Sequence, residues 1–258
     1  MEDRLILKFL GTGTSQGIPV VACKCATCKS EDPRDKRLRT SVFIQYKNVD
    51  ILIDTGPDLR QQLLQNHIEE LDAILLTHEH ADHTAGLDDI RPLYFKNRRP
   101  IPLYAIERVV QDLQKRFQYI FGDNDYPGIP KLDLITIDQN SEFLIKGLPV
   151  RPLPVIHGQL PILGFAIGPL AYITDAKYID HTVLDSIKGI DCLVVNALHF
   201  EEHHSHFNLQ QALDTIQKIQ PKVAYLVHMS HHMGKTKNLE SQLPTKVFLA
   251  YDGLEIVI

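Results

Sequence analysis

The feature that most constrains this chain is a cluster of metal-binding side chains placed directly after an apolar strand. The segment reads LLTHEHADHTAGL, in which His78, His80, Asp82 and His83 form the pattern H-x-H-x-D-H. Alternation along an extended loop places the imidazoles of His78 and His80 on one side, and Asp82 and His83 then turn toward a neighbouring position. One short loop can thus supply ligands to two metal ions, as two-metal hydrolysis requires.

The order of the other elements favours an α/β fold in two halves. Short runs rich in Val, Ile, Leu and Phe predict strands at residues 4–10, 42–46, 49–53, 71–77, 132–137, 142–145, 148–156, 163–167, 171–174, 191–197 and 222–228. Helical spacing predicts helices at residues 57–67, 87–95 (interrupted by Pro92), 107–121, 178–187 and 208–219. Residues 246–258 predict a closing hairpin with an Asp-Gly turn. We expect two sheets packed face to face with helices outside, in one domain spanning residues 1–258.

Composition and charge narrow the class of partner. The 258 residues carry 27 basic and 32 acidic side chains, a formal net charge of −5, which argues against nucleic acid as an obligatory partner. The apolar runs are too short to span a membrane, and the acidic start MEDRLILKFL does not resemble a secretory signal. We therefore expect a cytoplasmic protein without membrane association.

Two N-terminal segments allow two interpretations each. The basic segment RDKRLRTS, with Arg34, Lys36, Arg37 and Arg39, is either a solvated loop or a basic lip that attracts a phosphorylated substrate. The stretch GTGTSQG after the first strand either lines the floor of a pocket or is a plain tight turn.

Three of the four cysteines form a cluster that has no evident fourth metal ligand. Cys23, Cys25 and Cys28 stand in a C-x-C-x-x-C cluster, and the fourth cysteine, Cys192, lies in an apolar run. Thiols stay reduced in the cytoplasm, where clustered cysteines more often bind metal than pair. Three thiolates leave a structural zinc one ligand short; the alternative is a disulfide with a leftover thiol.

The segment THEHADHTAGL resembles the signature of the metallo-β-lactamase superfamily, whose four-layer αββα sandwich matches the two-half pattern. The resemblance implies that His78, His80 and His157 hold one metal ion and that Asp82, His83 and His228 hold another. Asp175 would bridge the two divalent ions, either zinc or manganese. It also implies that a hydroxide bridging the metals attacks the substrate and that Asp82 positions it.

The start LGTGTSQGIPVVACKCATC resembles the PhnP branch of that superfamily, the phosphoribosyl cyclic phosphate phosphodiesterases. This resemblance implies a structural zinc held by Cys23, Cys25, Cys28 and His231, with His232 as the rival for the fourth place. It also implies a catalytic histidine at His206, with His203 and His204 as nearby competitors. Departures from the branch are Asp88 and Asp89, which stand where it is apolar, and the loop at residues 121–131.

These resemblances imply a metal-dependent phosphoric diester hydrolase acting on a small, for example ribosyl, cyclic phosphate ester. The expected partner is a small phosphorylated substrate, and a homodimer is an open alternative. Two other functions compete: a hydrolase that processes the 3′ end of tRNA, and a non-hydrolytic protein of cofactor synthesis that resembles PqqB. A secreted lactamase or a thioesterase of the glyoxalase II type fits less well.

Overall fold

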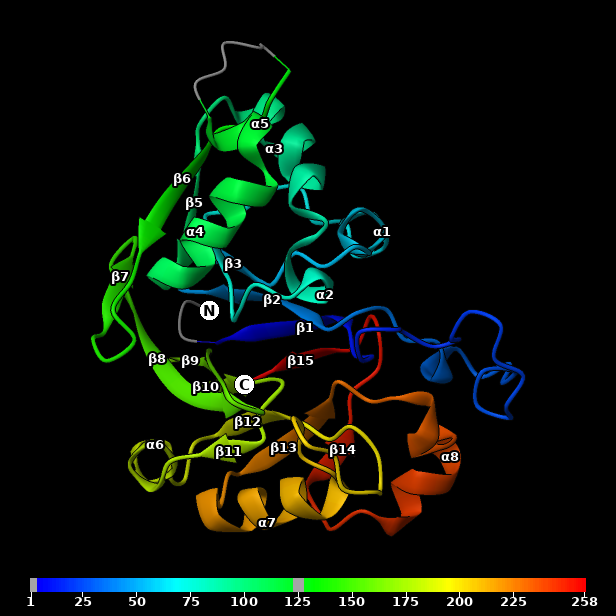
Figure 1. The fold of residues 1–258 in the computed structure, drawn as a ribbon. Coiled ribbons are helices and arrows are strands. Elements are labelled where there is room, and N and C mark those ends of the chain that lie inside the picture. The colour runs from blue at the N-terminus through cyan, green and yellow to red at the C-terminus, as the bar shows by residue number, and fades with distance from the viewer. Residues whose placement is uncertain (1–3, 123–127) are drawn as a thin grey trace.

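Two β-sheets packed face to face form the centre of the protein, as the computed structural model in Figure 1 shows. The structure describes residues 4–122 and 128–258. The strands of the first half are β1 (Ile6–Gly11), β2 (Ser41–Tyr46), β3 (Val49–Ile53), β4 (Ala73–Leu75), β5 (Ile101–Ala105), β6 (Leu132–Thr136) and β7 (Phe143–Ile145). Those of the second half are β8 (Leu148–His157), β9 (Leu160–Ile167), β10 (Leu170–Ile173), β11 (Tyr178–Ile179), β12 (Cys192–Asn196), β13 (Val223–Val227), β14 (Val247–Leu249) and β15 (Glu255–Val257).

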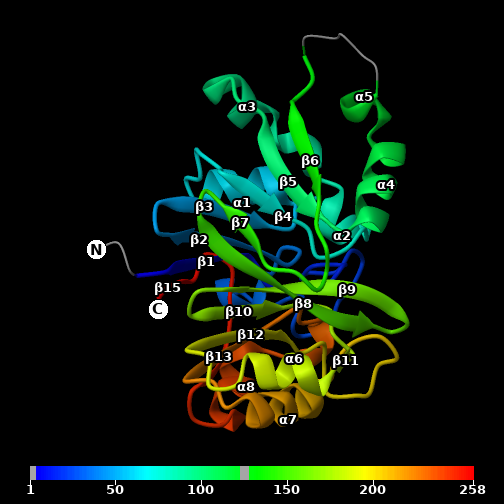
Figure 2. The same ribbon diagram turned by 90° about the vertical axis from the view of Figure 1, so that its left-hand side faces the viewer.

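Helices cover the outer face of each sheet, as the view turned by 90° also shows (Figure 2). Over the first sheet lie α1 (Leu59–Gln65), α2 (Ala81–Thr84), α3 (Arg91–Asn97), α4 (Glu107–Arg116) and α5 (Gln118–Phe121). Over the second lie α6 (His181–Ser186), α7 (Leu209–Ile219) and α8 (Thr236–Leu239). Short 3₁₀ turns are η1 (Pro33–Asp35), η2 (Leu87–Ile90), η3 (His231–Met233) and η4 (Glu240–Gln242).

The sheet order gathers the parallel strands on one side of each sheet, from its middle to one edge strand. Within the described ranges, the first sheet runs β15-β1-β2-β3-β4-β5-β6 and the second runs β11-β8-β9-β10-β12-β13-β14, with β7 paired to β8. Strands β3 to β6 are mutually parallel, and so are β10, β12, β13 and β14. The carboxyl ends of such strands meet at one edge of a sheet, where α/β proteins place their ligands.

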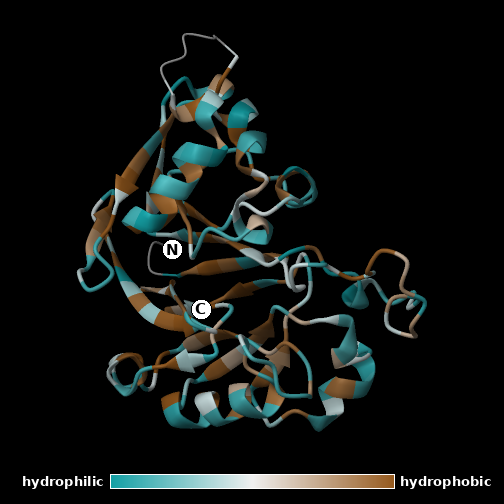
Figure 3. Ribbon diagram, viewed as in Figure 1, coloured by the Kyte–Doolittle hydropathy of each residue, from teal (hydrophilic) through white to brown (hydrophobic). Residues whose placement is uncertain are grey.

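Three separate hydrophobic cores correspond to the three spaces between four layers. One core joins residues from both sheets, such as Phe9, Ile44, Phe165 and Val194. Hydropathy colouring shows apolar strands between polar outer helix faces (Figure 3). A second core lies under α1 to α4 and a third under α6 and α7. The predicted four-layer αββα fold of the metallo-β-lactamase type is confirmed.

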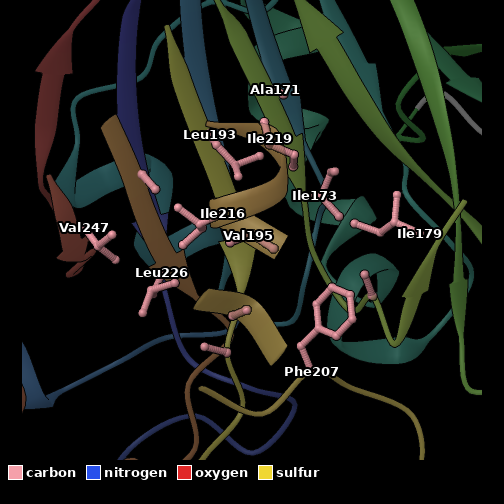
Figure 4. Packing of buried hydrophobic residues seen from close by; sticks show 14 of the residues in the cluster. Ala171, Ile173, Ile179, Leu193, Val195, Phe207, Ile216, Ile219, Leu226 and Val247 are labelled. Carbon is pink, nitrogen blue, oxygen red and sulfur yellow. The ribbon is translucent and has the colours of Figure 1, made fainter. Parts of the chain in front are cut away.

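Helix α7 illustrates how the outer layers are held. Its capping box joins Asn208 and Gln211 at the first turn, which satisfies two backbone donors. Ile216 and Ile219 pack with Leu193 and Val195 of β12 (Figure 4). Each buried aliphatic side chain of this size stabilises the fold by about 1.5–3 kcal/mol, so the amphipathic spacing of this helix decides its place.

The predicted closing hairpin is wrong. Strand β14 pairs in parallel with β13 in the second sheet, whereas β15 pairs antiparallel with β1 in the first. The Asp-Gly turn exists, but Asp252 accepts hydrogen bonds from the Thr12 hydroxyl at 2.7 Å and from the Leu38 amide at 2.6 Å. These bonds direct the chain from one sheet to the other, so the last two strands do not meet.

Two predicted helices are divided. The helix expected at 107–121 breaks between α4 and α5 at Phe117, whose backbone leaves the helical region (φ −111°, ψ 43°). The helix expected at 87–95 is η2 followed by α3, and Pro92 lies in the first turn of α3, where proline's missing N–H costs no helical bond. Of the predicted loop at 121–131, residues 123–127 lie outside the described part.

No helix in the described part is long and apolar enough to cross a membrane.

Candidate metal centre

The predicted ligands converge because each follows the end of a strand at the same edge of the sandwich. His78 comes three residues after the end of β4, His157 ends β8, Asp175 lies two residues after β10, and His228 follows β13 directly. In this way the structure brings together all seven predicted active-site ligands. They form two groups with donor atoms within 4.8 Å of one another: His78, His80 and His157, and Asp82, His83, Asp175 and His228.

In the first group the imidazole nitrogens face one another. His78 Nε2 lies 3.0 Å from His80 Nδ1, and the ring of His157 lies 5.2 Å from that of His80. The far nitrogens are held from outside: His78 Nδ1 lies 2.9 Å from the Thr77 hydroxyl, and His157 Nδ1 lies 2.8 Å from the Ser205 carbonyl oxygen. Such outer hydrogen bonds orient histidine ligands in metal sites.

In the second group Asp175 is the shared carboxylate. Its Oδ1 lies 3.0 Å from His228 Nδ1, and its Oδ2 lies 3.5 Å from His83 Nε2. The same Oδ2 lies 3.9 Å from His78 Nε2 of the first group. Asp82 Oδ2 lies 3.2 Å from His83 Nε2. Asp175 therefore stands between the two groups, where a bridging ligand is expected.

Asp54 is a buried acid that the sequence reasoning missed. Its carboxylate accepts from the Thr77 amide at 2.9 Å and lies 2.7 Å from His83 Nδ1, which turns His83 Nε2 toward Asp175. Nearby, a Cβ on Gly56 would lie 2.2 Å from the Asp82 carbonyl oxygen, so only glycine permits this approach. The available signal was an acid directly after the apolar strand VDILI, at the same edge as the histidine motif.

The pKa values in the second group reflect strong attraction between its buried histidines and carboxylates. Burial would lower the pKa of His83, but Asp175, Asp82 and Asp54 hold it well above its ordinary value. Burial would raise the pKa of Asp175, but His228 and His83 hold it well below its ordinary value. Among the described residues, the buried nitrogens His83 Nε2 and His228 Nδ1 have no hydrogen-bond partner of proper geometry. Inward-facing nitrogen and carboxylate donors of this kind fit a pair of divalent metal ions.

Backbone strain collects at the same place. Asp54, Asp175 and His228 adopt positive φ angles of 66°, 59° and 57°, in a region that residues other than glycine rarely occupy. Asn196 helps to hold the turn after Asp175, because its side chain bonds both backbone groups of Ala176 at 2.7 and 3.0 Å. Such strain is typical of functional sites whose surroundings fix the conformation.

His206 lies against the centre, outside the two ligand groups above, and forms a third group with His157 and Asp175 whose donor atoms lie within 4.8 Å of one another. It is 8% exposed, and its Nδ1 lies 3.9 Å from Asp175 Oδ2. Its ring lies 4.5 Å from that of His157 and 4.9 Å from that of His228. Burial lowers the pKa of His206. Of the two competitors, His204 is exposed, and His203 lies beside His206 at a ring distance of 5.2 Å.

The cysteine cluster gathers around His231 rather than His232. The Sγ atoms of Cys23, Cys25 and Cys28 lie 3.3, 3.4 and 3.6 Å from His231 Nδ1, and all three thiols are free. Tetrahedral zinc with ordinary bond lengths separates sulfur and nitrogen ligands by about 3.5 Å. Hydrogen bonds, first from the Cys28 amide and then with His231, lower the pKa of Cys25 to about 6. The donor set therefore fits a zinc ion.

Both interpretations of the basic segment are wrong for Arg37. The residue is 4% exposed, and its guanidinium donates to the Thr12 hydroxyl at 2.7 Å and to the Ala250 carbonyl at 2.5 Å. Arg34 pairs with Asp32, and Arg39 with Asp58. Lys36 donates to the Cys28 carbonyl at 3.2 Å. The segment thus braces the N-terminal loop against the end of the chain.

The stretch GTGTSQG lies beside the metal centre. The Thr14 hydroxyl is 3.1 Å from His228 Nε2, and Thr14, Ser15 and Gln16 line a cavity of about 180 Å³. The two acidic departures, Asp88 and Asp89, make different contacts. Asp88 accepts from Arg91 and from Tyr119, each at 2.6 Å, and Asp89 lines a separate hollow beside α1.

Comparison with known proteins defines the class. The family model for the beta-lactamase superfamily domain matches residues 50–229, and the chain therefore belongs to that superfamily. The αββα fold and the histidine motif agree with this assignment.

Particular relatives add detail. The structure superposes on a diphosphatase of the PhnP family with a TM-score of 0.92 and 38% identity, covering 99% of this chain and 97% of that one. An octanoyltransferase of Porphyromonas gingivalis is 43% identical over 252 residues, which are 97% of this chain and 51% of that protein. The chain thus spans about half the length of that relative. Zn²⁺-bound PqqB from Methylobacterium extorquens shares the fold at a TM-score of 0.79 and 20% identity, over 97% and 99% of the two chains.

Proposed function

We propose that this protein is a binuclear metal-dependent phosphodiesterase that hydrolyses a small, for example ribosyl, cyclic phosphate ester. The observation that carries the proposal is the position of Asp175 between two groups of inward-facing donors. His78, His80 and His157 would hold one ion, Asp82, His83 and His228 the other, and Asp175 both. When bound, two divalent ions, zinc or manganese, supply Lewis acidity toward a phosphoryl group and toward water.

The residues around the metals have separate tasks in this proposal. Asp82 lies within 3.2 Å of His83 and faces the shared space, where it would orient the attacking water as a hydrogen-bond acceptor. His206 would donate from its inward-facing Nδ1 to a phosphoryl oxygen or protonate the leaving oxygen. The Cys23, Cys25, Cys28 and His231 cluster would hold a structural zinc, since four ligands complete a closed site.

A second candidate reaction is hydrolysis of a diphosphate. The structural likeness to a PhnP-family diphosphatase favours it. A phosphoanhydride and a phosphodiester present the same phosphoryl centre, so the same donors would serve both. The octanoyltransferase relative does not favour acyl transfer here, because the match leaves half of that protein to carry its named activity.

The other expectations remain part of the proposal. The net charge of −5 favours a small phosphorylated substrate over an obligatory tRNA partner. The complete set of seven donors favours hydrolysis over a purely binding role of the PqqB kind. We propose a cytoplasmic protein that acts as one domain over residues 1–258, and we leave the homodimer as the alternative to a monomer.

A panel assay tests the function. The protein, loaded separately with Zn²⁺ and Mn²⁺, is offered bis(p-nitrophenyl) phosphate, a ribosyl cyclic phosphate, a nucleoside diphosphate, a thioester and a precursor tRNA. We expect turnover of the first two. Turnover of the diphosphate alone would favour diphosphate hydrolysis over phosphodiester hydrolysis. Cleavage of only the thioester or the tRNA would refute both of these candidate reactions.

A further inference from the structure

Ser205 makes hydrogen bonds to two histidines that demand opposite tautomers. The Ser205 carbonyl oxygen lies 2.8 Å from His157 Nδ1, and because a carbonyl only accepts, Nδ1 carries the proton and Nε2 keeps its lone pair. The Ser205 amide donates to His203 Nδ1 at 3.3 Å, so here Nδ1 keeps the lone pair. In the neutral ring of His203 the proton is therefore on Nε2. His157 is prepared to bind a metal, and His203 is prepared to donate a hydrogen bond.

Packing fixes this arrangement. Gly158, directly after His157, has a φ of +63°, and a Cβ there would lie 3.2 Å from Ser205 Cβ. The Ser205 hydroxyl also lies 3.2 Å from His203 Nδ1. The loop is anchored on its other side by the Phe207 amide, which donates to the Ala176 carbonyl at 2.7 Å. Ser205 therefore has little freedom to release either histidine.

His203 lines the cavity of about 180 Å³ that adjoins the metal centre. Its ring lies 5.2 Å from that of His206, and Thr14 joins the cavity wall to His228. Ser15, Gln16 and His232 add hydroxyl, amide and imidazole groups to the described lining, which contains no carboxylate. A cavity lined with neutral hydrogen-bonding groups and free of carboxylates suits oxygen atoms that accept hydrogen bonds.

We propose that this cavity is a subsite for the oxygen-rich, non-reacting end of the substrate and that the Nε2–H of His203 donates a hydrogen bond to it. The inference rests on the proposed function and adds a contact for substrate choice to it. Metal binding is a poorer explanation. The Nε2–H offers no lone pair, and among the described residues His199, His203 and His232 do not belong to any group whose donor atoms lie within 4.8 Å of one another. Burial also lowers the pKa of His203, which keeps it a neutral donor. Sugar hydroxyls and a second phosphate present the same acceptor oxygens.

The tautomer is tested first, by ¹⁵N NMR of histidine-labelled, Zn²⁺-loaded protein. We expect an unprotonated Nδ1 and a protonated Nε2 for His203, with the reverse for His157. Addition of ribose 5-phosphate should shift the Nε2 signal of His203. A protonated Nδ1, or a signal unmoved at saturating ribose 5-phosphate and ribose, would overturn the inference whether or not the protein hydrolyses phosphodiesters.

Steady-state kinetics of variants on several substrates then separate the contribution of the subsite from that of the reaction itself. The variants are His203→Leu, which removes the donor, His203→Gln, which keeps an N–H near the Nε2 position, and His204→Leu as the exposed neighbouring control. The substrates are 5-phosphoribosyl 1,2-cyclic phosphate, ribosyl 1,2-cyclic phosphate and bis(p-nitrophenyl) phosphate. For His203→Leu we expect kcat/KM to fall about tenfold on the ribosyl substrates relative to bis(p-nitrophenyl) phosphate, with partial recovery in His203→Gln.

The pattern of losses identifies the occupant. A loss confined to the phosphorylated ribosyl substrate assigns a phosphate to the cavity, and an equal loss on both ribosyl substrates assigns hydroxyls. Equal changes on all three substrates, or the same change in His204→Leu, would overturn the subsite. A wild type inactive on all three would refute the proposed function instead, and the NMR result would then decide the subsite alone.

Discussion

At the scale of single residues, the candidate centre depends as much on side chains behind the ligands as on the ligands themselves. Asp54 holds His83 at 2.7 Å, and the Ser205 carbonyl holds His157 at 2.8 Å. Each contact fixes which ring nitrogen faces inward, and a ligand in the wrong tautomer cannot bind a metal ion. Changes to these outer residues should therefore alter one metal position at a time.

Replacing Asp54 by Asn should weaken the position shared by Asp82, His83 and His228. The Asn side chain can still accept from the Thr77 amide, but it no longer offers His83 a charged acceptor. We expect affinity for the second metal ion to fall roughly 10–100-fold, measured by titration calorimetry on the chelator-treated protein. Asp50→Asn, on strand β3 just before Asp54, serves as the control. Equal affinities in the wild type and Asp54→Asn would remove Asp54 from this role.

Replacing His206 by Ala should separate catalysis from metal binding. Its Nδ1 lies 3.9 Å from Asp175 Oδ2, and we propose that it transfers a proton or donates a hydrogen bond rather than binding a metal ion. We expect turnover to fall by roughly 10²–10⁴ while the metal content, measured by mass spectrometry, stays at the wild-type level. Loss of a metal ion would instead make His206 a ligand, and unchanged kinetics would leave it without a role.

Most of the candidate centre could be predicted from sequence, because His78, His157, Asp175 and His228 lie at the ends of apolar strands. His80, Asp82 and His83 share one short motif with His78. Asp54 could not be separated from an ordinary turn acid, because its importance depends on the pairing of β3 with β4. The tautomer of His203 depends on a backbone contact in the folded loop, which no residue pattern encodes.

At the scale of elements, the two sheets are joined by the turn that the sequence predicted as a hairpin. A strand pattern shows that β14 and β15 exist, but the partners of a strand are chosen by tertiary packing. Here Asp252 fixes the path of the chain between β14 and β15, because it accepts hydrogen bonds from the Thr12 hydroxyl and the Leu38 amide. The same contacts bury its carboxyl group, and burial raises the pKa of Asp252 from 3.8 to about 6.

This shift predicts a pH dependence of stability. Between about pH 4 and 6 the carboxyl group is ionised in the unfolded chain and protonated in the fold, so unfolding releases a proton. The stabilising contribution of Asp252 is therefore complete below pH 4 and falls as the pH rises to 6. Urea unfolding at several pH values should show the stability difference between wild type and Asp252→Asn shrinking over this range. A difference that grows would contradict the account, and Asp133→Asn, an exposed acid on β6, is the control.

At the scale of the whole molecule, the cysteine cluster ties the N-terminal loop to the last ligand loop. Cys23 and His231 are 208 residues apart in sequence, and His231 is three residues from His228. Figure 1 shows the N-terminal loop extending beside the segment that carries α8. A zinc ion in this cluster would therefore fix both the loop and the position of His228.

Replacing Cys25 by Ser should act on structure before chemistry. We expect a lower Tm, the loss of one tightly bound zinc per chain, and an indirect decrease in activity as His228 is displaced. Cys192→Ala, in the core between the sheets, should lower the Tm through packing alone and keep the zinc. A Cys25→Ser variant with the wild-type zinc content, or a Cys23–Cys28 disulfide in protein purified under reducing conditions, would refute the zinc site.

The central claim is that Asp175 joins two metal positions in one centre, apart from the cysteine site. The most direct test is metal content per chain, measured by mass spectrometry for the wild type and Asp175→Ala after loading and desalting, with circular dichroism to check that both are folded. The account predicts three ions in the wild type and one, zinc, in Asp175→Ala, which should also lack phosphodiesterase activity. A folded Asp175→Ala protein that retains three ions and near-normal turnover would contradict it.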